Sequence, residues 1–139
     1  MDMTPYRFAH RKLVAWQVAR ELADRVRPVV LRLPRRYGKL AEQLLNAALA
    51  TEALIAEGAN RYTPAQKRQR FVEARGECGE TASHLERLWR FRLIDKTEVT
   101  EMLALGSCTS VHEPKVREST GNETHGSAAE PPCSPRLRG

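Results

Sequence analysis

The chain has 139 residues, and its 23 lysine and arginine residues outnumber 17 acidic ones to give a net charge of +6. This length is enough for one domain with its own hydrophobic core. The sequence contains no run of 18 apolar residues and no apolar N-terminal signal, which argues against a membrane protein and predicts a cytoplasmic one.

The first predicted helix runs from about His10 to Leu33. Its apolar residues recur in steps of four and three, as in the seam of a helical bundle: Ala15, Ala19, Leu22, Val26, Val29 and Leu33. Pro28 lies inside this helix, where we expect a kink or the loss of one backbone hydrogen bond, at a cost of about 3 kcal/mol. Pro34 ends the helix, and residues 35–38 make a basic turn.

The second predicted helix extends from about Gly38 to Glu57. Residues 40–55 are apolar nearly all round, with only Glu42 and Glu52 charged. A helix of this kind is covered by neighbours on most sides, so we expect it to be the central helix of a bundle. Gly58 is predicted to be its C-terminal cap.

The third predicted helix starts at Thr63-Pro64-Ala65-Gln66, which combines a capping hydroxyl, a proline at the first position and a glutamine three residues on. Its apolar positions are Phe71, Ala74, Cys78, Ala82, Leu85 and Leu88 or Trp89. Gly76 and Gly79 weaken this helix by up to about 1 kcal/mol each. We expect them to allow close approach of a neighbouring helix.

The fourth predicted helix starts at a second capping-box sequence, Asp95 to Glu98, and ends near Gly106. From Ser107 onward, apolar residues are almost absent, which predicts disorder. The fold class is therefore all-α: an antiparallel up-and-down four-helix bundle over residues 1–106, with a short fourth helix and a disordered tail over residues 107–139.

Positive charge is concentrated in residues 1–39, which hold ten basic and three acidic side chains. A basic surface predicts an anionic partner, and nucleic acid is favoured over a membrane because no Trp/Phe/Leu wedge accompanies the charge. The candidate nucleic-acid-binding residues are Arg20, Arg25, Arg27, Arg32, Arg35, Arg36 and Lys39. The alternative is a solvated surface that only keeps the protein soluble.

Catalytic and metal sites have little support in the sequence. No nucleophile elbow, P-loop, zincin or dinucleotide fingerprint is present, so we predict a protein that is not an enzyme and has no cofactor. Glu52, Glu77 and Glu80 are expected to be solvated or paired with arginine, and Cys78 to be a buried apolar residue.

Two other residue sets are of types that bind metals or stack on bases. Cys108, His112, His125 and Cys133 are residue types that zinc accepts, but their spacing fits no zinc module, so we expect no metal site. Trp16 and Trp89 are aromatic side chains of the kind that stack on bases, but each adjoins an apolar stripe, which favours core or interface packing.

Several short motifs, in this order and spacing, resemble the bacterial four-helix-bundle proteins encoded in 23S ribosomal RNA intervening sequences. The motifs cover about residues 8–105: Ala15-Trp16-Gln17, Ala19, Leu22, Leu33-Pro34, Tyr37-Gly38, Gln43, Ala47-Ala48, Ile55-Ala56-Glu57-Gly58, Ala74, Gly76, Glu80, Leu85 and Leu93-Ile94-Asp95. Residues 33–38 also resemble the accessory variability determinant of diversity-generating retroelements, which has the same fold.

The resemblance implies a homopentameric ring with a basic surface, which in the retroelement branch binds nucleic acid and a reverse transcriptase. Leu45-Asn46 and Leu54 stand where the family commonly has a basic pair and an asparagine, which weakens the transfer of a polar site on the second helix. We predict a non-enzymatic, oligomeric bundle that binds RNA or DNA through phosphate contacts, with a reverse transcriptase as partner in the retroelement case. The alternative is a protein-binding scaffold.

Overall fold

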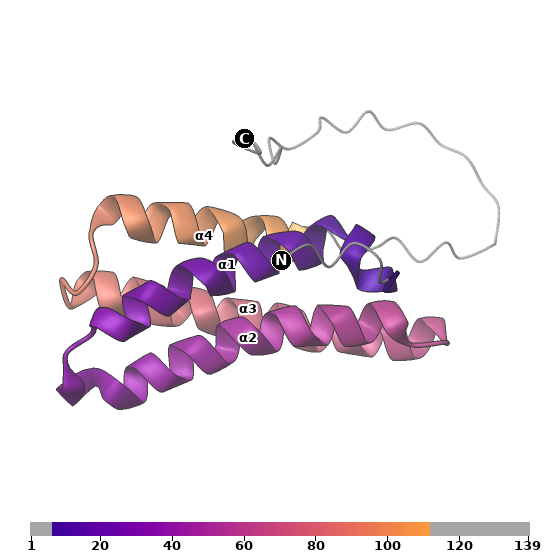
Figure 1. The fold of residues 1–139 in the computed structure, drawn as a ribbon, viewed down its shortest axis with the longest axis horizontal. Coiled ribbons are helices and arrows are strands. Elements are labelled where there is room, and N and C mark those ends of the chain that lie inside the picture. Colours follow the sequence, from indigo (N-terminus) through magenta and orange to yellow (C-terminus); the bar gives the residue numbers. More distant parts are fainter. Residues whose placement is uncertain (1–6, 112–139) are drawn as a thin grey trace.

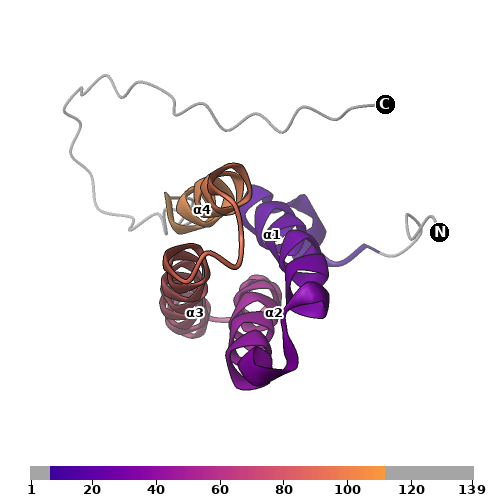
Figure 2. The ribbon, with the colours of Figure 1, turned by 90° about the vertical axis from the view of Figure 1, so that its left-hand side faces the viewer.

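The structure is a computed structural model that describes residues 7–111. Its four α-helices are α1 (Val14–Arg32), α2 (Gly38–Asn60), α3 (Pro64–Arg90) and α4 (Lys96–Val111), and two 3-10 turns precede α1 and α2: η1 (Ala9–Lys12) and η2 (Arg35–Tyr37). Consecutive helices run antiparallel (Figure 1). Viewed from the end, α1 lies diagonally opposite α3, and α2 opposite α4 (Figure 2). The predicted all-α bundle is confirmed.

The main core lies along the bundle axis and contains side chains from all four helices. The largest fully buried apolar residues are Leu22 and Val26 of α1, Leu44 of α2, and Leu85 and Leu88 of α3. Met102 and Val99 of α4 belong to the same cluster. A smaller cluster around Ala19, Ile55 and Ala74 includes the partly buried rings of Trp16 and Phe71. These positions follow the predicted seam because three-and-four spacing places them on one face of each helix.

Local capping fixes the starts of α3 and α4, as the sequence predicts. The backbone N–H of Gln66 donates to Thr63 Oγ1 at 3.2 Å, and the backbone N–H of Thr63 donates to Gln66 Oε1 at 3.5 Å. At α4, the Glu98 amide donates to Asp95 Oδ1 at 2.8 Å and the Asp95 amide donates to Glu98 Oε2 at 3.4 Å. Each capping box satisfies two backbone donors that the helix itself leaves free.

Gly58 is not the C-terminal cap of α2, so this prediction is wrong. The helix continues to Asn60, and Gly58 is buried without a positive φ. A Cβ atom at Gly58 would lie 2.8 Å from Phe71 Cε1 and 3.2 Å from Arg70 Cβ. Glycine at this position therefore allows α3 to pack closely on α2.

The predictions for Gly76, Gly79 and the end of α4 are also wrong. A Cβ atom at Gly76 or Gly79 would meet nothing within 4 Å, so neither glycine allows a close approach in the bundle. Helix α4 continues through Gly106 to Val111, because Gly106 is buried against Cys78, whose thiol donates to the Gly106 carbonyl at 3.3 Å. Residues 107–111 are thus helical, and the rest of the predicted tail lies outside the described residues.

The start of α1 also differs from the prediction, because residues 9–12 form a 3-10 turn and the α-helix begins at Val14. The helix continues through Pro28 to Arg32. Proline has no backbone N–H, so the carbonyl of Asp24, an exposed residue, receives no hydrogen bond from position 28. Within residues 7–111, no helix is both long and apolar enough to cross a bilayer.

The glycine environments predict opposite effects for two identical substitutions. Gly76→Ala is expected to raise the free energy of unfolding by about 0.5–1 kcal/mol, because alanine favours the helix and the added methyl group meets open space. Gly58→Ala gains the same propensity but forces the Phe71 ring to move, which costs about 1–3 kcal/mol. Urea unfolding followed by circular dichroism measures both. A Gly58→Ala variant as stable as Gly76→Ala would contradict the tight α2–α3 contact.

Candidate nucleic-acid interface

The turn between α1 and α2 and the turn between α3 and α4 lie at the same end of the bundle (Figures 1 and 2). An up-and-down arrangement requires this, because the first and third connections of such a bundle are at one end. The rings of Tyr37 and Phe91 join the two turns, with their centroids 6.3 Å apart. Residues about fifty positions apart in the sequence therefore form one surface.

Six exposed cations occupy this surface, which we call the basic end. They are Arg35, Arg36 and Lys39 from the first turn and the start of α2, and Arg90, Arg92 and Lys96 from the end of α3, the second turn and the start of α4. Within the part of the chain that the structure describes, none of the six forms an ion pair. The Arg36 guanidinium lies over the Tyr37 ring at 5.2 Å.

Acidic side chains at this end are fewer than basic ones, and two of them already have partners. Residues 32–42 and 86–98 together contain eight basic and four acidic residues. Asp95 accepts the capping hydrogen bond of α4, and Glu98 accepts from Arg32. The basic end therefore has an excess of positive charge.

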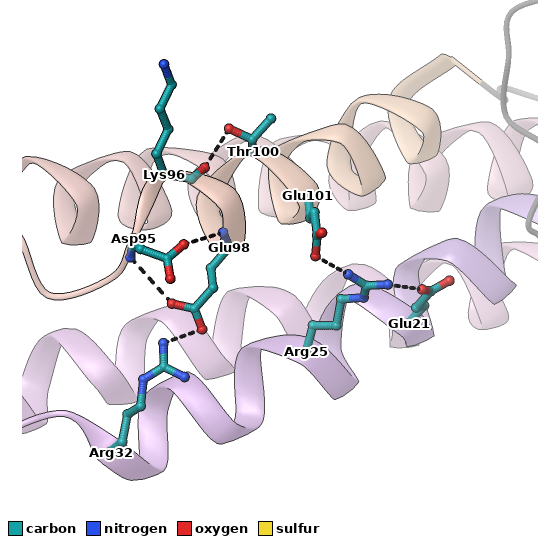
Figure 3. Close-up of polar contacts among 8 residues, drawn as sticks. All are labelled: Glu21, Arg25, Arg32, Asp95, Lys96, Glu98, Thr100 and Glu101. Carbon is teal, nitrogen blue, oxygen red and sulfur yellow. Dashed lines mark hydrogen bonds and ion pairs between the residues drawn. The ribbon is translucent and has the colours of Figure 1, made fainter.

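Arg25 and Arg32, two of the predicted binding residues, pair with glutamates of α4 (Figure 3). Arg25 donates to Glu21 and to Glu101, each at 2.9 Å, and Arg32 donates to Glu98. Exposed ion pairs of this kind stabilise by about 0.2–1 kcal/mol. These two arginines therefore connect α1 to α4. Because they are already paired with carboxylates, they are less available to phosphates than the cations of the basic end.

Arg20 and Arg27 lie seven residues apart and so share a flank of α1, on the helix itself and not on the two turns of the basic end. The Arg20 guanidinium lies over the Trp16 ring at 5.7 Å. Arg20 also acts on Glu52, whose pKa is raised by burial and by Asp24, while Arg20 opposes this rise. The seven predicted residues are thus divided among three places, and only Arg35, Arg36 and Lys39 belong to the six cations of the basic end that form no ion pair among the described residues.

The sequence interpretation missed three cations of the basic end: Arg90, Arg92 and Lys96. The available signal was the alternation of aromatic and basic residues from Trp89 to Arg92, a pattern that suits nucleic acids because rings stack on bases and cations contact phosphates. Trp89 is 47% exposed and Phe91 is 50% exposed, so neither is a core residue. The expected packing role is confirmed for Trp16 alone, which lies in the smaller core cluster.

A second group of cations lies at the opposite end, near the turn between α2 and α3. It includes Arg7, Lys12, Lys67 and Arg68, while Arg61 and Arg70 pair with Glu57 and Arg70 also pairs with Glu73. Between the two ends lie several acidic residues: Glu21, Asp24, Glu52, Glu77, Glu80 and Glu101. Positive charge is therefore found at both ends of the bundle rather than only on the first helix and its turn.

Some of the candidate catalytic and metal-binding residues lie within residues 7–111. Glu80 pairs with His84, whose Nε2 lies 3.3 Å from Glu80 Oε1, and Cys78 is buried, as expected. Residues 7–111 contain no group of three or more His, Cys, Asp or Glu side chains that could hold a metal ion. Of the four residues considered for zinc, only Cys108 belongs to this part of the chain, and His112, His125 and Cys133 lie outside it.

Comparison with known proteins agrees with the bundle and its extent. No curated protein matches the chain. The family described as 23S rRNA-intervening sequence protein matches residues 11–111, which include all four helices and more than half of the chain. The chain therefore belongs to the 23S rRNA-intervening sequence protein family.

Proposed function

We propose that this protein is a non-enzymatic nucleic-acid-binding bundle whose basic end contacts the phosphates of RNA or DNA. The observation that carries the proposal is the meeting of two turns that together present six exposed cations without ion pairs among the described residues. A guanidinium or ammonium group free of carboxylate partners can replace the counterions of a phosphate chain. Arg35, Arg36, Lys39, Arg90, Arg92 and Lys96 are the proposed contacts.

Binding is expected to be largely independent of sequence and steeply dependent on salt. Six phosphate contacts on duplex DNA correspond to a slope of about −5.4 for log Kobs against log salt, and of about −4 on a single strand. Fluorescence anisotropy with labelled duplex DNA, structured RNA and an RNA–DNA hybrid, between about 50 and 200 mM salt, measures this slope. If no ligand binds at the lowest salt, the charge serves solubility and the proposal fails.

The proposal includes self-association, because a ring would bring several basic ends onto one assembly. Large apolar side chains are exposed on the first three helices, among them Leu31 at 70%, Leu49 at 47% and Val72 at 55%. Exposed apolar residues of this kind, where they form a patch, mark interfaces. Light scattering after size exclusion should give a multiple of 15.7 kDa, and five subunits is the number that the family resemblance implies. A monomer at micromolar concentration would contradict this part of the proposal.

The second candidate function is a protein-binding scaffold, which the same exposed apolar residues favour. In that case Leu31, Leu49 and Val72 would contact a different protein, and the basic end would only be solvated. A reverse transcriptase is the partner that the retroelement resemblance suggests. Nucleic-acid binding at the basic end distinguishes the two functions, because the scaffold does not require it.

A further inference from the structure

We infer that a groove beside Trp89 holds an unpaired nucleobase, so that the basic end prefers single-stranded nucleic acid to a duplex. This inference rests on the proposed nucleic-acid-binding function and adds to it a class of ligand. The groove lies between the end of α3 and the start of α4, is also lined by Arg32 of α1, and has a volume of about 590 Å³. Trp89, Arg92, Leu93, Ile94 and Lys96 are among its lining residues.

The groove combines an aromatic surface with cations. Trp89 has about half of its side chain exposed, although a ring of this size is among the most costly to leave in water. A base that stacks on an aromatic ring gains about 5- to 150-fold in affinity. Arg92 and Lys96 line the same groove and supply cations for the phosphates on either side of the stacked base.

The carboxylates that line the groove favour an uncharged base over a phosphate beside them. Asp95 and Glu98 also line it, and each accepts a backbone hydrogen bond within the capping box of α4. Glu98 is in addition paired with Arg32 (Figure 3). A phosphate would be repelled here, whereas an uncharged base would not. Lys96 extends away from α1, so the phosphates are expected at the outer rim (Figure 3).

The backbone at Arg92 is strained in a way that keeps its side chain at this groove. Helix α3 ends in a Schellman motif, in which the Leu93 amide donates to the Leu88 carbonyl and the Arg92 amide to the Trp89 carbonyl, each at 2.9 Å. The first residue after the C-cap of such a motif needs a left-handed conformation, and glycine is usual there. In this chain that residue is Arg92, with a φ of 59°. Glycine would remove the strain but would also remove the guanidinium from the groove.

A single-tryptophan protein gives a direct test, because the chain has only two tryptophans. In Trp16→Phe, Trp89 is the sole tryptophan. The probes are an oligouridylate of about twelve nucleotides, an abasic oligomer with the same number of phosphates, and a duplex of equal length. We expect the oligouridylate alone to quench Trp89 and to bind about tenfold more tightly than the abasic oligomer.

Three outcomes overturn the inference in different ways. If the oligouridylate and the abasic oligomer bind equally and neither quenches Trp89, phosphate binding stands and base stacking is wrong. If neither binds, the proposed function fails together with the inference. A duplex that binds as tightly as the oligouridylate would also contradict the preference for unpaired bases.

Variants separate stacking from folding. Trp89→Ala should reduce the ratio of the affinities for the oligouridylate and the abasic oligomer to about one, as measured by fluorescence anisotropy. Tyr62 is an exposed aromatic residue at the opposite end, so Tyr62→Ala should leave this ratio unchanged. Arg92→Gly should raise the midpoint of thermal unfolding, since it relieves the left-handed strain, and yet lower affinity for the oligouridylate several-fold. If Arg92→Gly keeps full affinity, the side chain has no part in the site.

Discussion

Leu44→Ala is expected to lower the free energy of unfolding by about 2–5 kcal/mol, the largest stability change among the substitutions considered for this bundle. Leu44 is fully buried on α2 and belongs to the core cluster that also contains Leu22, Leu85 and Leu88. Truncation removes apolar contacts and leaves a cavity that three other helices cannot fill without moving. For a domain of about 100 residues, each 1 kcal/mol lowers the unfolding midpoint by about 4–8 °C.

Leu49→Ala is the matched control, because it makes the same change in the same helix. Leu49 is 47% exposed in the single bundle, so at a protein concentration low enough to keep the chain monomeric its truncation should change the free energy of unfolding by less than about 0.5 kcal/mol. Any effect of helix propensity is shared by both variants and cancels in the comparison. Urea unfolding followed at 222 nm measures both. Equal losses for Leu44→Ala and Leu49→Ala would mean that α2 presents a different face to the core.

Charge reversal at Arg35 and Arg36 is expected to produce the largest loss of nucleic-acid affinity. Both side chains are exposed, and neither has an ion pair within residues 7–111, so their replacement by glutamate breaks no ion pair in that part of the bundle. Two lost phosphate contacts should reduce the salt slope on duplex DNA from about −5.4 to about −3.6. At fixed salt we expect affinity to fall by at least about tenfold, since the new carboxylates also repel phosphates.

A charge-matched variant at the opposite end controls for net charge. Lys12 and Arg68 are exposed and lack ion pairs among the described residues, and Lys12→Glu with Arg68→Glu changes the net charge by the same amount. If binding depends on the basic end, this control should retain its affinity and its slope. Equal losses for the two double variants would show that the phosphate contacts are not confined to the basic end. Circular dichroism checks that both variants remain folded.

Local signals in the sequence were sufficient for the starts of α3 and α4 but not for the ends of α2 and α4. The capping boxes at Thr63 and Asp95 involve residues three positions apart, so they can be recognised without knowledge of the fold. The ends of α2 and α4 depend on other helices, because Phe71 covers Gly58 and Cys78 covers Gly106. A glycine that ends a helix in isolation is retained inside the helix when a neighbour packs on it.

The candidate site was predictable only where it is local. Arg35, Arg36 and Lys39 are neighbours in the sequence and were identified directly. Their partners Arg90 and Arg92 lie about fifty residues away, and only the alternation of helix directions brings them to the same end. Glu101 and Glu98, which pair with Arg25 and Arg32, likewise come from α4, more than sixty residues along the chain. Helix periodicity predicts which side chains share a flank of α1, but it does not predict which charged residues of another helix face that flank.

The cations at the two ends of the bundle lie far enough apart to attract a charged ligand independently. Helix α3 has 27 residues and spans about 40 Å from one end of the bundle to the other. The electrostatic screening length is about 8 Å at physiological salt and about 30 Å at 0.01 M. A polyanion at one end is therefore shielded from the cations at the other at physiological salt, and the two ends influence each other only in very dilute buffer. At physiological salt, the local charge of each end governs attraction, and the overall charge of +6 does not.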